Sequence, residues 1–205
     1  TGGFRIGVSQ KLMTKSLANI TGIDQDKIAY QIMGEWNPDT VTFQQLILNP
    51  SKESFIFKPY PFYLANSIDK ELDKLGDCSN WAYENKWDGI RAQLIKRNNE
   101  VMIWSRGEEL ISKQFPELIK MGDLLDNGTV IDGEILPFKD GKIKSFNDIQ
   151  KRLGRKNVGQ TTLINNPVIL KAYDLLEYEN LDIRYQNYFQ RRKVLELIIE
   201  NLNND

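Results

Sequence analysis

The sequence contains no histidine and only one cysteine, Cys78, in 205 residues. A single cysteine excludes an internal disulfide and any zinc site built from several cysteines, and the absence of histidine removes the commonest metal ligand and acid–base side chain. No run of about 18 apolar residues could cross a bilayer, and the first residues lack the basic-then-apolar pattern of a signal peptide. We therefore expect an intracellular protein without a membrane partner, in which any catalysis depends on Lys, Arg, Asp, Glu or Tyr.

The chain has almost no net charge, because 27 basic residues stand against 28 acidic ones. The total gives no indication of nucleic-acid binding, and only a local excess of charge can do so. Such an excess occurs in residues 139–156, where seven basic residues accompany two acidic ones, a local charge of +5. A solvated helix and loop would have the same composition, so a contact with a polyanion and an ordinary surface both stay open at this point.

Apolar spacing and turn residues divide the chain near residue 58. Residues 11–19 and 24–33 have helical periodicity, with Gly22 as a stop for the first helix and Asp24 as an N-cap for the second. Prolines at positions 59 and 61 then mark a boundary, after which the pattern changes. The pattern predicts a short all-α segment ahead of a second domain.

Strand patterns dominate after residue 81. We expect strands over residues 90–96, 101–105, 129–136 and 168–176. Asn98 and Asn99 are expected to form the hairpin turn between the first two strands. Helices are expected over residues 67–75, 115–125, 145–153 and 185–202, the last with one apolar face formed by Leu195, Ile198, Ile199 and Leu202. Because the strands come in hairpins rather than alternating with helices, the fold class is α+β (mixed α/β), with a largely antiparallel sheet and flanking helices.

The strongest local feature is the segment 84–91, which reads Glu-Asn-Lys-Trp-Asp-Gly-Ile-Arg. We expect Lys86 at a strand end, followed by a turn and then Arg91, so that a nucleophile and a phosphate-binding group lie close together. A lysine attacks phosphorus only as the free amine, which neighbouring cations and desolvation favour, and Arg91 together with a metal ion would supply both. Asp-Gly is also the commonest hairpin signal, so this motif alone is more often a plain surface turn.

Three further segments follow the lysine motif in order. They read Ser-Arg-Gly-Glu at 105–108, Val-Ile-Asp-Gly-Glu at 130–134 and Lys-Ala-Tyr-Asp-Leu-Leu at 171–176. Each has an ordinary interpretation by itself: Asp-Gly at 132–133 and at 140–141 as turns, Arg106 as a solvated charge and Tyr173 as core. Their order and spacing together are far less frequent by chance.

This series resembles the covalent nucleotidyltransferases, namely ATP-dependent DNA ligases, RNA ligases and mRNA capping enzymes. They share a Lys-x-Asp-Gly-x-Arg motif, an Arg-Gly element, an Asp-Gly-Glu element and an aromatic-Asp strand in this order. Residues 59–65 and 145–156 resemble the ATP-dependent DNA ligases in particular, and residues 1–9 resemble the end of the helical DNA-binding domain that precedes their catalytic core. The resemblance implies that residues 1–57 are the C-terminal part of that helical domain. Residues 58–205 would then be the N-terminal portion of the adenylation domain, with a fold of the ATP-grasp-like nucleotidyltransferase type.

The resemblance also implies a role for each matching residue. Lys86 matches the nucleophile that attacks the α-phosphate of ATP, giving a lysyl–AMP phosphoramidate and pyrophosphate. Glu84 matches the position that helps to hold adenine, and Tyr173 matches the aromatic residue that stacks on the base. Arg91 and Arg106 match residues that bind the ribose and phosphates, a task suited to a permanently charged guanidinium with several donors.

Glu134 matches the acidic residue of the Asp-Gly-Glu element, which contacts either the ribose or the metal, and both options stay open. Mg²⁺ is implied beside ATP, because the pyrophosphate leaving group needs charge neutralisation. The parent enzyme would seal nicks in double-stranded DNA during repair, replication or recombination. It would do so as a monomer, in the cytoplasm or, in a bacterium, the nucleoid. The residues expected to contact DNA phosphates are Lys151, Arg152, Arg155 and Lys156.

Later elements of the family are absent from the sequence: a Glu-Gly-x-x-x-Lys strand, a Lys-x-Lys strand and an OB-fold domain. Because the chain also begins with Thr1, we expect an excised piece that binds ATP weakly and adenylates itself slowly or not at all. Two other interpretations stay open. An RNA ligase or capping-type enzyme is disfavoured by the helical start and by residues 145–156. A non-catalytic DNA-binding module is disfavoured by Lys86, which has no use in such a protein beside two arginines.

Overall fold

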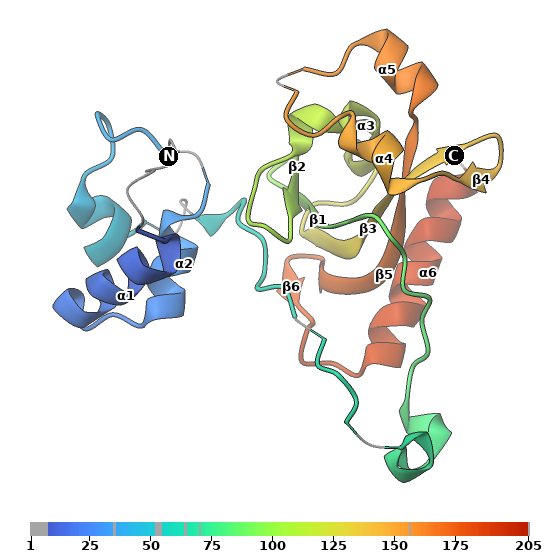
Figure 1. Ribbon diagram of the computed structural model, residues 1–205, viewed down its shortest axis with the longest axis horizontal. Coiled ribbons are helices and arrows are strands. Elements are labelled where there is room, and N and C mark those ends of the chain that lie inside the picture. The colour runs from blue at the N-terminus through green and yellow to red at the C-terminus, as the bar shows by residue number, and fades with distance from the viewer. Residues whose placement is uncertain are drawn as a thin grey trace.

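The computed structural model describes residues 8–34, 36–51, 55–63, 65–69, 71–155 and 157–204. A small helical part lies beside a larger part built on one antiparallel sheet, and the chain between them makes a long excursion before it enters the sheet (Figure 1). No helix in these stretches is both long enough and apolar enough to cross a membrane.

The helical part contains α1 (Gln10–Thr21), α2 (Gln25–Ile32) and the π-helical turn η1 (Gln44–Leu48). Gly22 ends α1 in a left-handed conformation with φ of 71°, which glycine adopts without steric cost. The Asp24 carboxylate accepts two backbone amides from the first turn of α2. Both helices expected from the sequence are therefore confirmed, whereas residues 1–7 lie outside the described part of the chain.

The larger part is a six-stranded sheet made of β1 (Ile90–Arg97), β2 (Glu100–Ser105), β3 (Thr129–Lys139), β4 (Lys142–Ile143), β5 (Val168–Tyr178) and β6 (Leu181–Asp182). The strand order is β2-β1-β3-β5-β6, with β4 paired to β3, and every pairing is antiparallel. Asn98 and Asn99 join β1 to β2 with φ angles of 51° and 63°, the geometry of a two-residue hairpin turn. The four strands and the α+β fold class expected from the sequence are confirmed.

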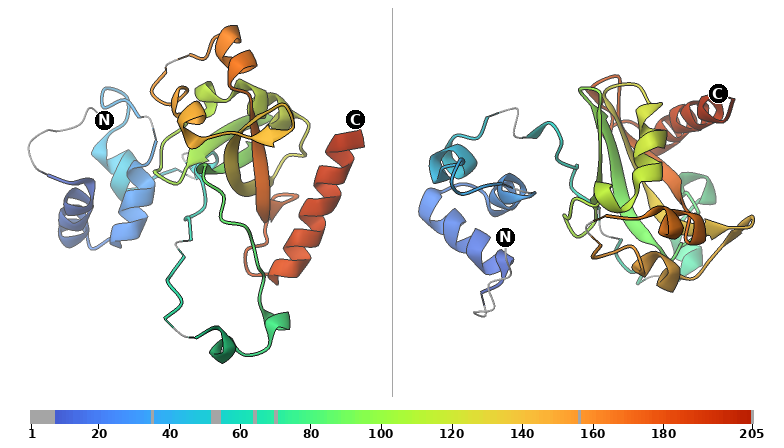
Figure 2. Two further views of the ribbon diagram at one scale, coloured as in Figure 1. Left: turned by 45° about the vertical axis from the view of Figure 1, so that its right-hand side comes forward. Right: turned by 90° about the horizontal axis from the view of Figure 1, so that it is seen from above.

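One face of the sheet carries the main core under three helices, as Figure 2 shows: α3 (Pro116–Asp123), α4 (Phe146–Gln150) and α6 (Tyr188–Asn204). The short helix α5 (Gln160–Asn165) lies beyond them, and a 3-10 turn, η5 (Ser112–Gln114), precedes α3. Leu94, Ile131 and Leu175 from three neighbouring strands are at most 1% exposed in this core. The expected apolar face of the last helix also packs here, with Leu195 buried at its centre. Alternation along each strand thus directs one set of side chains to the helices and the other set to the opposite face.

The segment that leads from the helical part to the sheet binds to the opposite face of the sheet. The Trp104 indole of β2 is 4% exposed and donates to the carbonyl of Phe57 at 2.7 Å. The buried Lys58 ammonium donates to the carbonyls of Tyr30 and Gln31 at the end of α2, at 2.8 and 2.6 Å. These bonds hold the connecting segment to both parts, although a domain boundary near residue 58 stays a prediction.

Two expectations for the segment before β1 are wrong. In place of a helix over residues 67–75 the described residues form only the 3-10 turns η3 (Leu72–Leu75) and η4 (Cys78–Asn80). Lys86 does not sit at a strand end, because residues 81–88 belong to no helix or strand and Gly89 leads directly into β1. A Cβ atom at Gly89 would collide with the carbonyl oxygen of Ile135, so glycine is required for close approach to β3 rather than for a hairpin. The Asp-Gly pair at 132–133 is likewise no turn, because it lies inside β3.

Candidate functional site

Strand register places three charged side chains in a row on the face opposite the main core. Arg91 of β1 is the ladder partner of Glu134 of β3, and Glu134 is the ladder partner of Lys171 of β5. Residues directly opposite one another in a ladder point to the same face of the sheet. Two of the predicted site residues are therefore neighbours because of the pairing of β1 with β3.

Tyr173 lies on the same face as Lys171, because it stands two positions later in β5. Asp132 pairs with Asp174 and Gly133 pairs with Ala172, so Tyr173 is the extra residue between two register positions. At this bulge the strand bends locally, and Asp174 follows Tyr173 on the same face. The Tyr173 ring lies beside the row of charges, with the Arg91 guanidinium 5.8 Å from the ring centroid.

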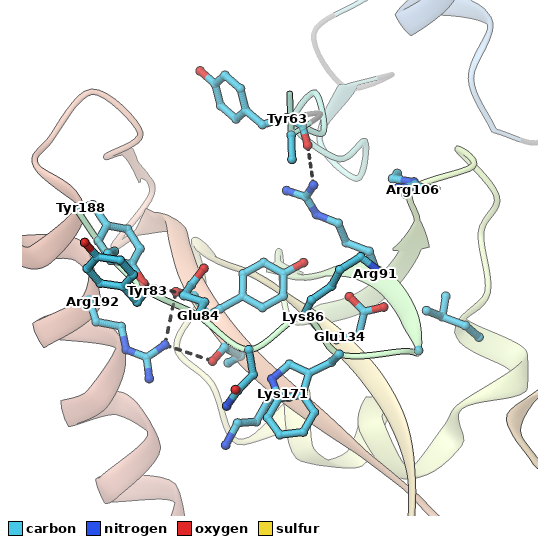
Figure 3. A pocket seen from close by; sticks show the side chains of 18 of the residues that line it. Tyr63, Tyr83, Glu84, Lys86, Arg91, Arg106, Glu134, Lys171, Tyr188 and Arg192 are labelled. Carbon is cyan, nitrogen blue, oxygen red and sulfur yellow. Dashed lines mark hydrogen bonds between the residues drawn. The ribbon is translucent and has the colours of Figure 1, made fainter. Parts of the chain in front are cut away.

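A cavity of about 1470 Å³ opens over these strands and over the segment before β1. It is larger than the roughly 300–1,000 Å³ of most small-ligand pockets. All six residues expected to act on ATP line it, namely Glu84, Lys86, Arg91, Arg106, Glu134 and Tyr173. Figure 3 shows Glu84 beside Tyr188 and Arg192 at the α6 side, Arg106 at the opposite side, and Lys86 and Glu134 between them. The structure thus brings the four sequence motifs to one place.

Arg91 is fixed within this cavity by a two-pronged ion pair. Its Nε and Nη2 atoms donate to the Asp132 carboxylate at 3.2 and 2.9 Å, and its Nη1 donates to the carbonyl of Tyr63. Asp132 is 4% exposed, and burial raises its pKa while the Arg91 guanidinium acts in the opposite direction. The pairing holds the guanidinium in one orientation, which a flexible lysine would not keep.

Lys86 and Glu84 lie on the irregular segment that crosses the cavity. The Lys86 side chain is exposed, and its ammonium makes no hydrogen bond or ion pair with any residue that the structure describes. The Glu84 carboxylate accepts a hydrogen bond from the Tyr188 hydroxyl at 2.7 Å. The lysine is thus available to an incoming molecule, while the glutamate two positions earlier is already oriented.

The cavity is positively charged overall. Six basic side chains line it against four acidic ones: Lys86, Arg91, Arg106, Lys171, Arg192 and Lys193 against Glu84, Asp88, Glu134 and Glu196. Burial raises the pKa of Glu134, an effect that the Gly89 amide and the Arg91 charge oppose. Burial also raises the pKa of Tyr173, reinforced by the Asp132 carboxylate. An excess of positive charge beside an uncharged aromatic ring suits a ligand with both phosphates and a base.

The donor set of the cavity fits a magnesium ion that is held mainly by its substrate. The described residues contain no cluster of three or more acidic, histidine or cysteine side chains. Asp132 is occupied by Arg91, which leaves Glu134 as the carboxylate beside the row of cations. Mg²⁺ is commonly bound through one or two carboxylates together with phosphates and water, so one carboxylate is sufficient here.

The expected DNA contacts fall into three groups. Lys151, which caps the C-terminal end of α4, and Arg155 in the loop after it are exposed, as a contact with phosphates requires. Arg152 is fully buried, where it donates to Glu117 at 2.5 Å and to the carbonyl of Gln114 at 3.1 Å. The prediction for Arg152 is therefore wrong, because its charge is neutralised inside the fold. Lys156 lies outside the described residues.

Several site residues were missed by the sequence analysis. Asp132 was recognised as a member of the Asp-Gly-Glu element but received no role, although it orients Arg91. Tyr188 and Arg192 line the cavity from the first two turns of α6, where helical periodicity carries no signal for them. Lys171 stands two positions before Tyr173 in its motif, and its register with Glu134 becomes visible only once the strands are paired.

Comparison with known proteins agrees with this geometry. The family described as ATP dependent DNA ligase domain matches residues 63–205. A probable DNA ligase of Koribacter versatilis is 31% identical over 178 residues, which cover 86% of this chain and 31% of the relative. DNA ligase 1 of Korarchaeum cryptofilum is 27% identical over 209 residues, which cover 98% of this chain and 37% of the relative. The chain thus spans about a third of the length of these relatives.

Among solved structures, the ligase domain from M. tuberculosis LigD is similar with a TM-score of 0.48 and 27% identity, covering 58% of this chain and 36% of that one. The family match covers residues 63–205, well over half of the chain, and the matched region contains every residue that lines the cavity. The chain therefore belongs to the family of ATP-dependent DNA ligase domains.

Proposed function

We propose that this chain carries the nucleotide site of an ATP-dependent DNA ligase, in which Lys86 takes up AMP. The observation that supports the proposal most is the convergence of all six motif residues on one positively charged cavity, with an accessible lysine between Glu84 and Arg106. A nucleophile has to be free to meet a phosphorus atom.

In the proposed reaction the Lys86 amine attacks the α-phosphorus of ATP. A nitrogen–phosphorus bond forms, the bond to the bridging oxygen breaks, pyrophosphate leaves and the amine loses a proton. Tyr173 and Glu84 hold the base at the α6 side, while Arg91 and Arg106 bind the ribose and phosphates. The Asp132 pair keeps Arg91 in place without loss of its charge, so the donors that meet the phosphates are preorganised.

Glu134 would hold Mg²⁺ as its single protein carboxylate, and the ion would supply neutralisation of charge on the leaving pyrophosphate. Glu134 suits this task because it is half-buried and lies next to Arg91 in the ladder, close to where phosphates are expected. Contact with the ribose is the other role open to it. The Glu134 carboxylate lies near three cations of the cavity and is available to bind either Mg²⁺ or the ribose.

The whole enzyme would then seal nicks in double-stranded DNA, passing AMP from Lys86 to the 5′-phosphate before the 3′-hydroxyl displaces it. The exposed Lys151 and Arg155 support a contact with the DNA backbone, since cations on a surface loop can replace counterions without reading sequence. Within the basic segment 139–156, Lys142 on β4 is also exposed and extends the basic surface.

The test is an intact-mass spectrum of the chain after incubation with ATP and Mg²⁺. We expect an AMP adduct on the wild-type chain and on Lys142→Ala, which removes an exposed lysine outside the cavity. No adduct is expected on Lys86→Arg, which keeps the charge but lacks a nucleophilic amine. An adduct on Lys86→Arg would overturn the proposal, and so would the absence of an adduct from a chain extended through the later lysine strands and the OB-fold domain.

A further inference from the structure

Glu84 owes its orientation to a residue that is distant in sequence. Its Oε1 atom accepts the Tyr188 hydroxyl at 2.7 Å, across a separation of 104 residues. Residues 81–88 form no helix or strand, so no ladder or helical turn fixes the direction of this side chain. Within the described part of the chain, this bond is the sole hydrogen bond of the carboxylate; it uses Oε1, Oε2 makes none, and Glu84 is among the residues that line the cavity.

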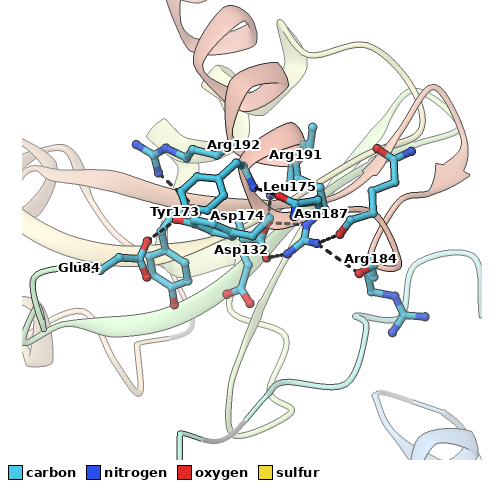
Figure 4. A network of polar contacts seen from close by, with 12 residues as sticks. Glu84, Asp132, Tyr173, Asp174, Leu175, Arg184, Asn187, Arg191 and Arg192 are labelled. Carbon is cyan, nitrogen blue, oxygen red and sulfur yellow. Dashed lines mark hydrogen bonds and ion pairs between the residues drawn. The ribbon is translucent and has the colours of Figure 1, made fainter. Parts of the chain in front are cut away.

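Tyr188 is itself held rigidly because the start of α6 is bound to β5. Arg191 donates to both oxygens of Asp174, at 2.9 and 2.8 Å. Arg192, one turn after Tyr188, donates through Nη1 to the carbonyls of Ala172 and Tyr173 at 3.2 and 3.3 Å. Figure 4 shows these arginines reaching from α6 to the bulged part of β5, next to Glu84. The start of α6 therefore fixes the Tyr188 ring and the Glu84 carboxylate relative to each other.

In the hydrogen bond between Tyr188 and Glu84, the tyrosine hydroxyl is the donor and the carboxylate is the acceptor. Burial, together with the bond to Glu84, raises the pKa of Tyr188 to about 12, with Arg192 opposing the shift and Asp174 adding to it. The hydroxyl therefore stays protonated and acts as the donor at neutral pH. Because a phenol carries no charge, it orients the carboxylate without neutralising it, unlike an arginine or lysine in the same place.

We propose that Tyr188 is a positioning residue that aims Glu84 at the C6 substituent of the purine, so that the pair selects adenine over 6-oxo purines. An ionised carboxylate only accepts hydrogen bonds. The 6-amino group of adenine donates to it, whereas the 6-oxo group of hypoxanthine or guanine would place two acceptors against each other. This inference rests on the proposed nucleotide site, and it adds the residue that sets base preference.

The alternative role for Tyr188 is that of a tether, which merely closes the long segment before β1 onto α6. The two roles predict different affinities. A tether affects every nucleotide equally, because it acts on the shape of the cavity. A positioning residue affects only a ligand that uses the open oxygen of Glu84, and therefore changes the ratio between an amino and an oxo purine.

The test is equilibrium binding of AMP and IMP by calorimetry, since these monophosphates differ at C6 and cannot transfer a nucleotide to Lys86. We expect the wild-type chain to bind AMP at least about tenfold more tightly than IMP, as for a charged hydrogen bond that the oxo purine lacks. Tyr188→Phe should reduce that ratio several-fold by weakening AMP alone. Tyr185→Phe, which removes an exposed hydroxyl from the turn just before α6, should leave both affinities unchanged.

The proposal is overturned if the wild-type chain shows no preference for AMP or no binding of AMP. It is also overturned if Tyr188→Phe lowers both affinities by the same factor or changes neither. Glu84→Gln supplies a second check, because its amide can donate to a 6-oxo group and should move the preference toward IMP. If ATP gives an AMP adduct but the chain shows no base preference, only the inference about Tyr188 fails. If the chain prefers AMP over IMP but gives no adduct, only the proposed covalent step at Lys86 fails.

Discussion

Replacement of Arg152 is the perturbation that best separates a structural role from a DNA contact. Arg152 is fully buried, its guanidinium lies 5.5 Å from the centroid of the Phe115 ring, and its ion pair with Glu117 measures 2.5 Å. Removal of one partner from a buried ion pair costs about 3–5 kcal/mol. The Glu117 side chain is 30% exposed, so water can reach the stranded carboxylate and the value at the low end applies.

We therefore expect Arg152→Ala to lower the free energy of unfolding by about 3 kcal/mol, which includes the cavity left above the ring. For a domain of this size the midpoint of thermal unfolding should fall by about 6 to 12 °C. Arg152→Met fills most of the volume and also removes the Nε donor, which has no partner among the described atoms. Its cost should be smaller, about 2 kcal/mol, because the cavity is filled although the Glu117 carboxylate still loses its partner.

The assay is urea unfolding followed by circular dichroism, combined with binding of nicked duplex DNA at several salt concentrations. Arg152→Met should bind DNA with the wild-type salt dependence, because the replaced charge never reaches the surface. If Arg152→Ala unfolded within about 0.5 kcal/mol of wild type, and lost DNA affinity with a shallower salt slope, the buried role would be refuted.

Three further outcomes follow from the same structure. Lys151→Ala removes an exposed charge and should make the slope of log affinity for nicked DNA against log salt shallower by about one, without effect on unfolding; an unchanged slope would exclude the contact. Gly89→Ala should lower stability by about 1–3 kcal/mol and slow adenylation, whereas Gly159→Ala, which lies outside the cavity and where an added Cβ meets no atom within 4 Å, should do neither. Burial lowers the pKa of Lys58 to about 8 from 10.5, so between pH 8 and pH 10.5 the unfolded chain binds more protons than the folded chain. The free energy of unfolding of wild type relative to Lys58→Met should therefore rise with pH across this range. A constant difference in urea unfolding from pH 8 to pH 10.5 would contradict the shift.

Local structure followed from the sequence where one or two residues decide it. Gly22 and Asp24 set the end of α1 and the start of α2, because a left-handed glycine and a capping carboxylate act on the adjacent backbone alone. Asn98 and Asn99 set the hairpin for the same reason. The expected helix over residues 67–75 failed, because its weak pattern has no apolar face to bury and no described residue of that stretch is buried.

The site was predictable as a set of residues but not as an arrangement. The motif around Lys86 and the later Arg106, Glu134 and Tyr173 were found from order and spacing, through their resemblance to the ligase family. Their positions within the cavity depend on which strands pair and on the course of the segment before β1. Strand pairing joins residues that are far apart in the chain, so no local pattern reveals it.

The sequence by itself determined the family, the strands, the capped helices and the lysine on which the proposed chemistry depends, since these are written in short segments. Only the tertiary structure decided that Arg152 turns inward to Glu117 while its neighbour Lys151 stays in solvent. It likewise decided that Tyr188 meets Glu84. The physical reason is common to both: a charged or polar side chain has the same chemistry in every sequence, and its role depends on the partner and the solvent that the fold places beside it.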